Sequence, residues 1–512
     1  MSEVRMAIPS RSGRWRVAPA PPLALGGSVD GPIGVVHVVA EFAPYARTGG
    51  LAEAVAALAK WQARSGLPVA VIMPLYRTVR RLAPTLVPVG RPLSLQVGAR
   101  TEQYRLFRLA PAAGAPRVYF IEHDGYFDRP GLYGSGGQDY GDNGMRFAFF
   151  ACAVLQVLPR IAGSPVVLHV HDWHAALAPV FLRTRFSGDP YYGGVRTVLS
   201  VHNAAFHGHF PFEILRVVGL PESLYDWRFL EWYGRVNYLK GGMAFADAVV
   251  TVSPKHATEL RTAVGGFGLQ GAFQALGDRL YGITNGIDQT LWDPEHDEFL
   301  PATYWIADLS GKRRCKASVQ RAFGLPQHQR APLIGMTGRL VTQKGLDLVV
   351  GNGALLATGA QFIVSGRGEA RLESALVDMA AHSHQRVGVK LQFSERLAHR
   401  LMAGSDFFLV PSLYEPCGLT QMECQRMGTI PIARRVGGLA DTVEDGVTGF
   451  LFNRFDPRSL VVAVRRAVAL YRNPLRWEAM VREAMVRDFS WGPAAAAYSA
   501  VYRRVLAAAV AG

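Results

Sequence analysis

The sequence predicts an α/β protein of two domains, each built around a mostly parallel, doubly wound β-sheet. A short β-branched run, a glycine-bearing turn and a helical pattern follow one another repeatedly, which is the order of elements in parallel α/β folds. The same order starts again in the second half. The chain of 512 residues also exceeds the usual size of one hydrophobic core, so domains of roughly 200 to 280 residues are expected.

The first series opens with a strand over residues 33–40, a turn at Gly49 and Gly50, and a helix over 51–65. Further strands are predicted where β-branched runs recur, over 68–73, 118–121, 166–170, 196–201 and 248–252. A second series is expected to begin near Leu280, with strands over 333–336, 361–364, 389–393, 407–410, 429–433 and 449–452. Ligands of such sheets bind at the carboxyl ends of the strands, so two domains facing each other predict a substrate cleft between them.

Composition predicts an ordered, soluble protein. Hydrophobic residues make up 49% of the chain and charged residues 19%. The longest apolar runs are interrupted by arginines or are too short to span a bilayer, so no membrane association is expected. The four cysteines have no paired spacing, which favours a reducing cytoplasm. Residues 1–30 lack the apolar stretch of a secretory signal; we expect a disordered tail, with a targeting segment as the alternative.

The chain carries a formal net charge of +15. Its lysines and arginines are scattered, with no basic block and no nucleic-acid-binding module, so no nucleic-acid partner is expected. A nucleotide or phosphate ligand explains part of this excess.

Two glycine-rich segments need different interpretations. Residues 41–51 (EFAPYARTGGL) place Gly49 and Gly50 at the start of a helix with Arg47 beside them, which suits an anion, although a tight turn with a surface arginine fits equally well. Residues 266–271 (GFGLQG) match a GxGxxG pattern. The preceding segment, 255–264, has a helical pattern instead of a strand, which argues against a dinucleotide fingerprint.

Polar residues cluster at the ends of two predicted strands of the first domain. In residues 169–174 (HVHDWH), alternation puts His169 and His171 on one face. Metal ligation by this pair is conceivable, but histidines at a strand end are more often hydrogen-bonded structural residues. His202 and Asn203 follow the next strand, where an active-site role and a structural role are equally plausible.

The second half offers cations and a carboxylate after strands. In residues 338–345 (GRLVTQKG), Arg339 and Lys344 suit a diphosphate, although a solvated loop has a similar pattern. In residues 411–421 (PSLYEPCGLTQ), Glu415 precedes a proline, and the backbone N–H groups of 418–421 could face a ligand. No Asp-x-Asp occurs, so a metal-bridged nucleotide-sugar site has no evident ligands, and neither a metal nor a cofactor is expected.

Taken together, these segments resemble the ADP-glucose-dependent glycogen and starch synthases over residues 35–491. Further matching segments are DGYFDRPGLYG (124–134), YLKGGM (238–243), TVSP (251–254), NGID (285–288), LAHR (397–400) and GGLADTV (437–443). The resemblance implies two facing Rossmann-like domains (the GT-B architecture) with an interdomain cleft. It assigns residues 31–282 to an acceptor-side domain, 283–490 to a nucleotide-sugar domain, and 491–512 to a helix packing back on the first domain.

The resemblance also implies residue roles. Asp172 and His202 match residues that the family places around the transferred glucose, with Glu415 as the third catalytic residue. Residues matched to ADP-glucose binding are Arg47, Gly49, Gly50, Arg339, Lys344, Cys417, Gly418, Leu419 and Thr420. Glu415 is expected to orient the glucose and stabilise positive charge at the anomeric carbon, in preference to acting as a nucleophile.

The sequence departs from the family pattern at four positions. The usual lysine is Arg47, the usual arginine is Leu413, the usual serine is Gly338 and the usual aspartate is Glu369. These changes bear on efficiency more than on reaction type.

The resemblance implies transfer of glucose from ADP-glucose to the non-reducing end of an α-1,4-glucan, with retention of configuration, in the cytoplasm. The partners implied are ADP-glucose and glycogen. Two alternatives stay open. One is a related ADP-glucose transferase with another acceptor such as glucose 1-phosphate. The other is a catalytically weak glucan-binding paralogue, which the departures at Arg47, Leu413 and Gly338 bring into consideration.

Overall fold

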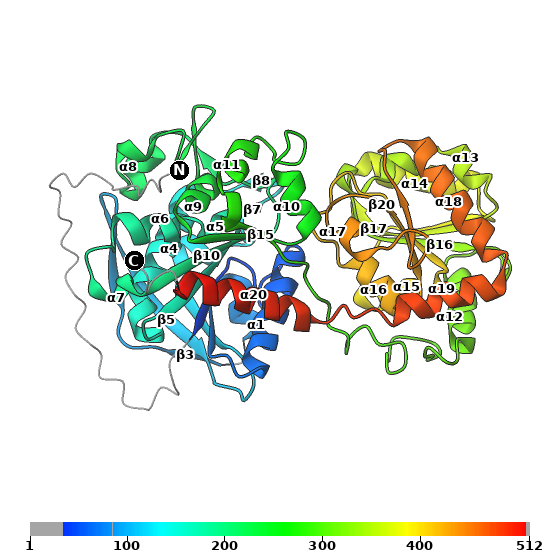
Figure 1. Cartoon of the computed structure of the whole chain (residues 1–512), viewed down its shortest axis with the longest axis horizontal. Helices are drawn as coiled ribbons and strands as arrows, with labels where there is room; N and C mark the ends of the chain where they lie inside the picture. Colours follow the sequence, from blue (N-terminus) through cyan, green and yellow to red (C-terminus); the bar gives the residue numbers. More distant parts are fainter. Residues whose placement is uncertain (1–33, 84, 508–512) are drawn as a thin grey trace.

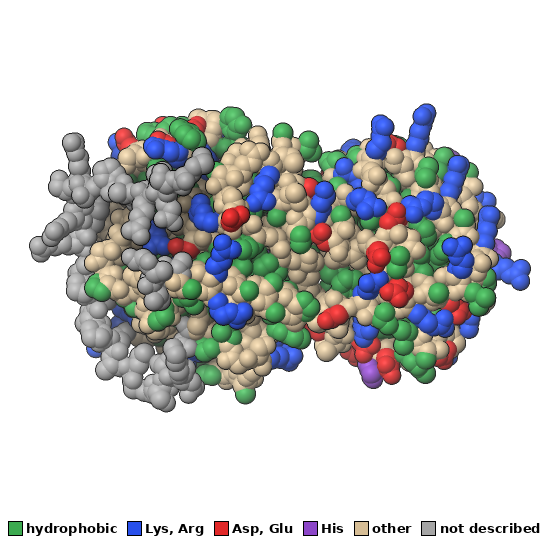
Figure 2. Space-filling view, in the orientation of Figure 1, with side chains coloured by type: hydrophobic (Ala, Val, Ile, Leu, Met, Phe, Trp, Pro, Cys, Tyr) green, Lys and Arg blue, Asp and Glu red, His purple; other side chains and the backbone are tan. Residues whose placement is uncertain are grey.

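The protein forms two α/β domains joined by a double crossover of the chain (Figure 1). The computed structural model describes residues 34–83 and 85–507; the tail predicted over residues 1–30 lies outside these. Lysines and arginines are spread over the visible surface of both domains (Figure 2), as the scattered sequence positions predicted.

The first domain is built on a 10-stranded sheet in the order β15-β14-β10-β9-β1-β2-β6-β5-β3, with β4 paired to β5. The strands from β15 to β6 run parallel, and β5 pairs antiparallel with β6, β3 and β4. Their bounds are β1 Val35–Val38, β2 Val69–Pro74, β3 Leu86–Pro88, β4 Leu93–Val97, β5 Arg100–Leu109, β6 Arg117–Glu122, β9 Val166–His171, β10 Val195–Val201, β14 Ala248–Thr251 and β15 Leu280–Gly282.

All six strands predicted for the first series are found, and the main differences lie in other strands. The hairpin strands β3 to β5 were not predicted, because they carry alternating polar residues and half-exposed side chains in place of a buried β-branched run. The strand at Leu280, from which the second series was expected to start, instead pairs with β14 and closes the first sheet. The second series therefore begins later, after a long connection.

Helices cover both faces of the first sheet. Helices α1 (Gly50–Arg64) and α20 (Trp491–Ala507) pack together on the face that carries Val35 and Val167. Helix α4 (Asn143–Ile161) belongs to the core on the opposite face, with α6 (Leu177–Thr184) and α9 (Tyr238–Phe245) beside it.

Helix α4 differs from the expectation that every apolar run is interrupted or too short. Among the described residues it is the one helix long and apolar enough to cross a bilayer, and 83% of its most apolar window is buried inside the protein. Burial within the domain accounts for this composition, because a helix that is apolar all round needs neighbours on all sides.

The second domain holds a parallel six-stranded sheet in the order β18-β17-β16-β19-β20-β21. The strands are β16 Leu333–Leu340, β17 Gln361–Gly368, β18 Val387–Lys390, β19 Phe407–Val410, β20 Ile430–Arg434 and β21 Phe450–Phe452. Strand β18 starts and ends earlier than the predicted 389–393. Helices α12 (Ser310–Ala322), α14 (Ala370–His382), α15 (Glu395–Gly404), α16 (Thr420–Arg426), α18 (Pro457–Tyr471) and α19 (Pro474–Met485) surround this sheet.

The chain crosses between the domains twice, and the two crossings lie side by side. The backbone N–H of Ile287 donates to the carbonyl of Phe489 at 2.8 Å. After the second crossing, α20 runs across the first domain beside α1 (Figure 1), where Tyr498 and Tyr502 are buried. The last helix therefore belongs in space to the domain that the chain left about two hundred residues earlier.

Candidate active site

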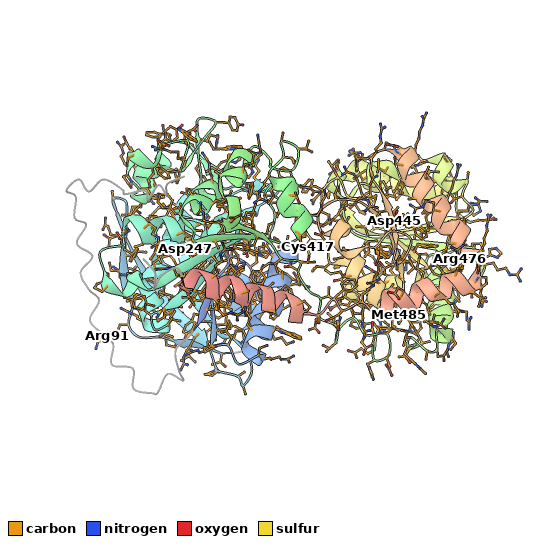
Figure 3. All side chains as sticks on the ribbon, in the orientation of Figure 1. Arg91, Asp247, Cys417, Asp445, Arg476 and Met485 are labelled. Carbon is orange, nitrogen blue, oxygen red and sulfur yellow. The ribbon has the colours of Figure 1, made fainter. Side chains whose placement is uncertain are left out.

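A cleft of about 1950 Å³ lies between the domains, and both domains line it. Every predicted site residue lies on its wall. The first domain contributes Arg47, Gly49, Gly50, Asp172 and His202, and the second contributes Arg339, Lys344, Glu415, Cys417, Gly418, Leu419 and Thr420. Figure 3 labels Cys417 where the second domain meets the first. The fold thus brings together segments almost four hundred residues apart.

The loop that carries Gly49 and Gly50, called the glycine loop below, precedes α1 and is held by the buried carboxylate of Glu41. Glu41 accepts hydrogen bonds from the Thr48 backbone N–H at 2.5 Å, from the Thr48 hydroxyl at 2.7 Å and from the Tyr133 hydroxyl at 2.7 Å. A Cβ atom added at Gly49 or Gly50 would meet no protein atom within 4 Å. Packing within the protein gives no reason for glycine there, whereas the close approach of a ligand does.

Arg47 extends from this loop along the cleft. Its side chain is 65% exposed, and its Nη1 lies 3.3 Å from the Glu53 carboxylate. An exposed pair of this length contributes little to stability, so the guanidinium can turn to a ligand at small cost.

Asp172 begins the short helix α5 (Asp172–Ala175) directly after β9 with a φ angle of +55°, an unusual backbone for a residue other than glycine. Its carboxylate accepts the backbone N–H of His202 at 2.7 Å. Burial raises the pKa of Asp172 to about 7. A left-handed backbone and a buried carboxyl group at the end of a strand make Asp172 a candidate functional residue.

His202 is half-buried at the end of β10 and lines the cleft. Burial lowers its pKa to about 4, so the imidazole is neutral at neutral pH. Its Nε2 lies 3.0 Å from Nδ1 of His171. His169 and His171 share one face of β9 with buried His37 beside them, as the alternation predicted.

In the second domain, Glu415 is held in place by two donors. Lys344 Nζ donates to Glu415 Oε2 at 2.6 Å, and the Ser412 hydroxyl donates to the same oxygen at 2.8 Å. The Glu415 residue is only 8% exposed. Arg339 lies near the end of β16, and Lys344 lies in the 3₁₀ turn η3 (Thr342–Lys344) that follows. The two cations and the carboxylate thus line the same wall.

The structure shows the surroundings of three residues that depart from the family pattern. Gly338 has a φ angle of +133°, a backbone that side chains disfavour. Glu369 accepts the backbone N–H of Thr342 at 3.0 Å, so it supports the segment between Arg339 and Lys344. Leu413 is 40% exposed, and its backbone N–H bonds to the Gln343 carbonyl.

Sequence reasoning missed two exposed aromatic residues that line the cleft, Phe393 and Phe206. Phe393 is 62% exposed and Phe206 is 59% exposed. Phe393 had been included in the predicted strand 389–393, but β18 ends at Lys390, which leaves this ring on the cleft wall. The polar residues around Phe393, namely Gln392, Ser394 and Glu395, were the available signal against a buried strand.

Both halves of the chain match known protein families. Residues 34–275 match the starch synthase catalytic domain, and residues 331–469 match the glycosyl transferases group 1 family. Glycogen synthase of Anaeromyxobacter sp. (strain Fw109-5) is 42% identical over 92% of this chain and 99% of its own length. Glycogen synthase of Geobacillus stearothermophilus is 40% identical, with 92% and 98% covered.

Solved structures agree as well. The catalytic domain of Starch Synthase IV from Arabidopsis thaliana, bound to ADP and acarbose, superposes with a TM-score of 0.83 and 32% identity, covering 93% of this chain and all of that one. Sucrose-phosphate synthase from Thermosynechococcus elongatus shares only the fold, with a TM-score of 0.59 and 19% identity over 93% of this chain and 99% of its own. The predicted resemblance and the two-domain GT-B fold are confirmed, and the chain belongs to the glycogen and starch synthase family of glucosyltransferases.

Proposed function

We propose that this protein transfers glucose from ADP-glucose to the non-reducing end of an α-1,4-glucan with retention of configuration, and so elongates glycogen. The observation that carries the proposal is the composition of the cleft. Arg339, Lys344 and Glu415 line its wall in the second domain, while the glycine loop, Asp172 and His202 line it in the first. This set supplies cations for a diphosphate and polar groups for a sugar.

The second domain is the proposed nucleotide side. Arg339 and Lys344 would bind the diphosphate, together with backbone N–H groups of Gly418, Leu419 and Thr420. The open space beside Gly49 and Gly50 would let the phosphates approach the loop from the opposite side, and Arg47 would add a further cation. Phe393 offers an exposed ring on which a nucleobase can stack. The related starch synthase was solved with ADP, which supports a nucleoside diphosphate as the ligand of this cleft.

The sugar would lie between Asp172, His202 and Glu415. Glu415 would orient the glucose and stabilise the positive charge that develops at the anomeric carbon, while Lys344, which contacts it, neutralises the departing ADP. Neutral His202 would hydrogen-bond the sugar. Glu415 would thus stabilise the positive charge on the sugar side of the breaking bond, and Lys344 the negative charge on the ADP side. Both groups are already in position, so the barrier is lowered without a large reorganisation.

Water must be kept from the reaction, because hydrolysis of ADP-glucose competes with transfer. The domains contact each other beside the site, where the rings of Phe267 and Tyr414 lie 5.0 Å apart between centroids. Closure of the domains over the substrate would exclude water and align the acceptor hydroxyl. The acarbose bound to the related starch synthase supports a glucan chain as the acceptor.

The test is an assay of the purified protein with ADP-glucose or UDP-glucose and with glycogen or glucose 1-phosphate as acceptor. We expect glucan elongation with a clear preference for ADP-glucose, and activity that persists in EDTA because the diphosphate charge is met by side chains. Equal efficiency with UDP-glucose, transfer to glucose 1-phosphate in place of glycogen, or loss in EDTA that magnesium restores would each contradict the corresponding part of the proposal. No product with either donor would contradict the proposed transfer and favour the alternative of a catalytically weak glucan-binding paralogue.

A further inference from the structure

A chain of hydrogen bonds runs from His202 into the core of the first domain. His202 Nε2 lies 3.0 Å from His171 Nδ1, and His171 Nε2 lies 3.0 Å from His37 Nδ1. His37 and His171 are completely buried. Neither residue lines the cleft. His171 contacts the proposed sugar-binding residue His202 directly, and His37 contacts His171.

The chain continues to the C-terminal helix. His37 Nε2 lies 2.8 Å from the Gln62 side-chain oxygen, and the Gln62 amide nitrogen donates to the Tyr502 hydroxyl at 3.2 Å. Gln62 is on α1 and Tyr502 is on α20, and both are buried. The Tyr502 hydroxyl also contacts His169 Nδ1 at 2.8 Å, and His169 Nε2 contacts the Ser200 hydroxyl at 2.7 Å.

His37, His169 and His171 are close enough to hold a metal ion, but their hydrogen bonds argue against this. Every ring nitrogen of the three already has a protein partner within 3.0 Å. A metal ion would have to displace several of these bonds in a buried place. The cluster is therefore interpreted as a hydrogen-bonded chain.

The hydrogen bonds from His202 to Gln62 all run in one donor-to-acceptor direction, which the Gln62 side-chain oxygen sets because it can only accept. Burial lowers the pKa of His37 and His202 to about 4 and the pKa of His171 well below its usual value, so each ring is neutral and carries one N–H. The Gln62 oxygen accepts, so His37 has its proton on Nε2 and accepts at Nδ1. His171 must then donate from Nε2 and accept at Nδ1, and His202 must donate from Nε2.

We propose that His171, His37 and Gln62 are positioning residues that hold His202 in the tautomer with its proton on Nε2. The Nδ1 of His202, which has no partner among the described residues, is then a hydrogen-bond acceptor for a sugar hydroxyl. The inference rests on the proposed role of His202 in the transfer reaction. It also ties the site to α20, the helix that follows the second interdomain crossing, because Tyr502 orients the Gln62 amide.

The decisive measurement is the protonation of the His202 ring in full-length protein labelled with ¹⁵N-histidine, with its signals identified by their loss in His202→Gln. We expect a protonated Nε2 and an unprotonated Nδ1 in the unmodified protein. In Gln62→Leu and His37→Leu, which remove the acceptor that sets the direction, the proton should redistribute to Nδ1. Turnover should fall about tenfold or more, while the Kd for ADP stays within about twofold.

Two further variants separate this role from simple packing. His37→Asn places an amide oxygen near the former Nδ1, so it should restore the His202 tautomer and most of the turnover lost in His37→Leu. Gln320→Leu makes the same change at an equally buried glutamine of the second domain and should alter neither readout. Thermal unfolding of each variant identifies any that do not fold.

The ¹⁵N signals of the His202 ring test the proposal independently of the transfer reaction, because they can be recorded without any turnover. A proton on Nδ1 of His202 in the unmodified protein would mean that the chain runs in the opposite direction, and the proposal would be wrong. Unchanged His202 signals in folded Gln62→Leu would also contradict it. If the unmodified protein transfers no glucose yet shows the expected signals, the positioning holds and the proposed function fails.

Discussion

Glu415 is the side chain whose charge should matter most for turnover. Its carboxylate is fixed by Lys344 and Ser412 and is almost completely buried, so its charge acts in a site of low dielectric constant. Glu415→Gln keeps the size and most hydrogen bonds but removes the charge, so kcat should fall about a hundredfold or more. Steady-state kinetics with ADP-glucose and glycogen measures this. Turnover near that of the unmodified protein, with ADP binding unchanged, would exclude the proposed role.

Arg47 stands where the family usually has lysine, in a loop held by Glu41. Its exposed guanidinium has only Glu53 as an ion-pair partner among the described residues, so it is available to a phosphate. Arg47→Ala should reduce kcat/KM by about 1.5–3 kcal/mol of transition-state stabilisation, the size of a charge-assisted hydrogen bond. Arg47→Lys should keep or improve activity, because an ammonium is smaller than the planar guanidinium.

The two substitutions at Arg47 test different properties. Kinetics unchanged in Arg47→Ala would make Arg47 a surface residue without a role in catalysis. An inactive Arg47→Lys would mean instead that the site depends on guanidinium geometry.

Asp172 should make the stability of the first domain depend on pH. Its folded-state pKa, about 7, lies above the usual 3.8, so the protonated carboxyl group favours the folded state. This contribution is complete below about pH 4 and is lost as pH rises through 7. Between pH 6 and pH 8 the unmodified protein should lose about 1 kcal/mol of unfolding free energy that Asp172→Asn retains. Asparagine tolerates the left-handed backbone, so the variant adds little strain.

Urea unfolding at the two pH values measures the effect of Asp172, with the exposed Asp278→Asn as the control. Equal pH dependence in the unmodified protein and in Asp172→Asn would show that the carboxyl group is ionised throughout this range.

Helix α12 is attached to the second domain by a buried cation. Lys316 Nζ lies within hydrogen-bond distance of the Asp406 carboxylate at 2.6 Å, the Tyr471 hydroxyl at 2.9 Å and the carbonyls of Gln329 and Ala331. Its side chain is only 6% exposed. One side chain therefore connects α12 to the sheet, to α18 and to the loop before β16.

Lys316→Met should destabilise the second domain by about 3–5 kcal/mol, because it leaves the Asp406 carboxylate buried without its cation. Denaturant unfolding followed by circular dichroism measures this. Removing both charges in Lys316→Met/Asp406→Leu should recover part of the loss. Arg454→Met, at an arginine whose side chain is 86% exposed, should change stability by less than about 1 kcal/mol. A loss as small in Lys316→Met as in Arg454→Met would contradict the attachment.

The two domains are joined by hydrogen bonds beside the cleft. Both oxygens of Glu259, on α10 (Pro254–Leu260), accept the backbone N–H of Gly437 at 3.1–3.2 Å. Asp441, in the same helix α17 (Gly437–Thr442), accepts the backbone N–H of Lys255 at 2.9 Å. Because α17 contacts the loop that carries Glu415, these bonds link the first domain directly to the proposed catalytic loop.

Removing the Glu259 carboxylate should therefore favour an open arrangement. In Glu259→Ala we expect a larger radius of gyration by small-angle scattering and a KM for ADP-glucose about three- to tenfold higher. The KM rises because part of the binding free energy of the substrate is then used to close the domains. Glu222→Ala, at an exposed glutamate elsewhere on the first domain, is the control. An unchanged radius and KM in Glu259→Ala would show that these bonds do not hold the domains together.

Most of the strands and candidate site residues of this protein can be predicted from the sequence, because the patterns that indicate them lie within short segments. Strands buried on both faces appear as mostly apolar runs, as at β1, β9 and β19, and polar residues soon after them indicate where ligands bind. The candidate residues after those strands all line the cleft. Half-exposed strands such as β5, and the place of β15 at the edge of the first sheet, could not be predicted, because they depend on which neighbour each strand pairs with.

Tertiary structure alone decided four features in and around the site. Glu41 holds the glycine loop and Glu259 holds α17, although neither stands next in sequence to the group it supports. Phe393 lies on the cleft because β18 ends early. The buried chain from His202 to Tyr502 joins residues three hundred positions apart, which only the return of α20 across the interdomain crossing brings together. Spacing along a chain reveals contacts within one element, but hydrogen bonds between elements depend on packing, which no local pattern encodes.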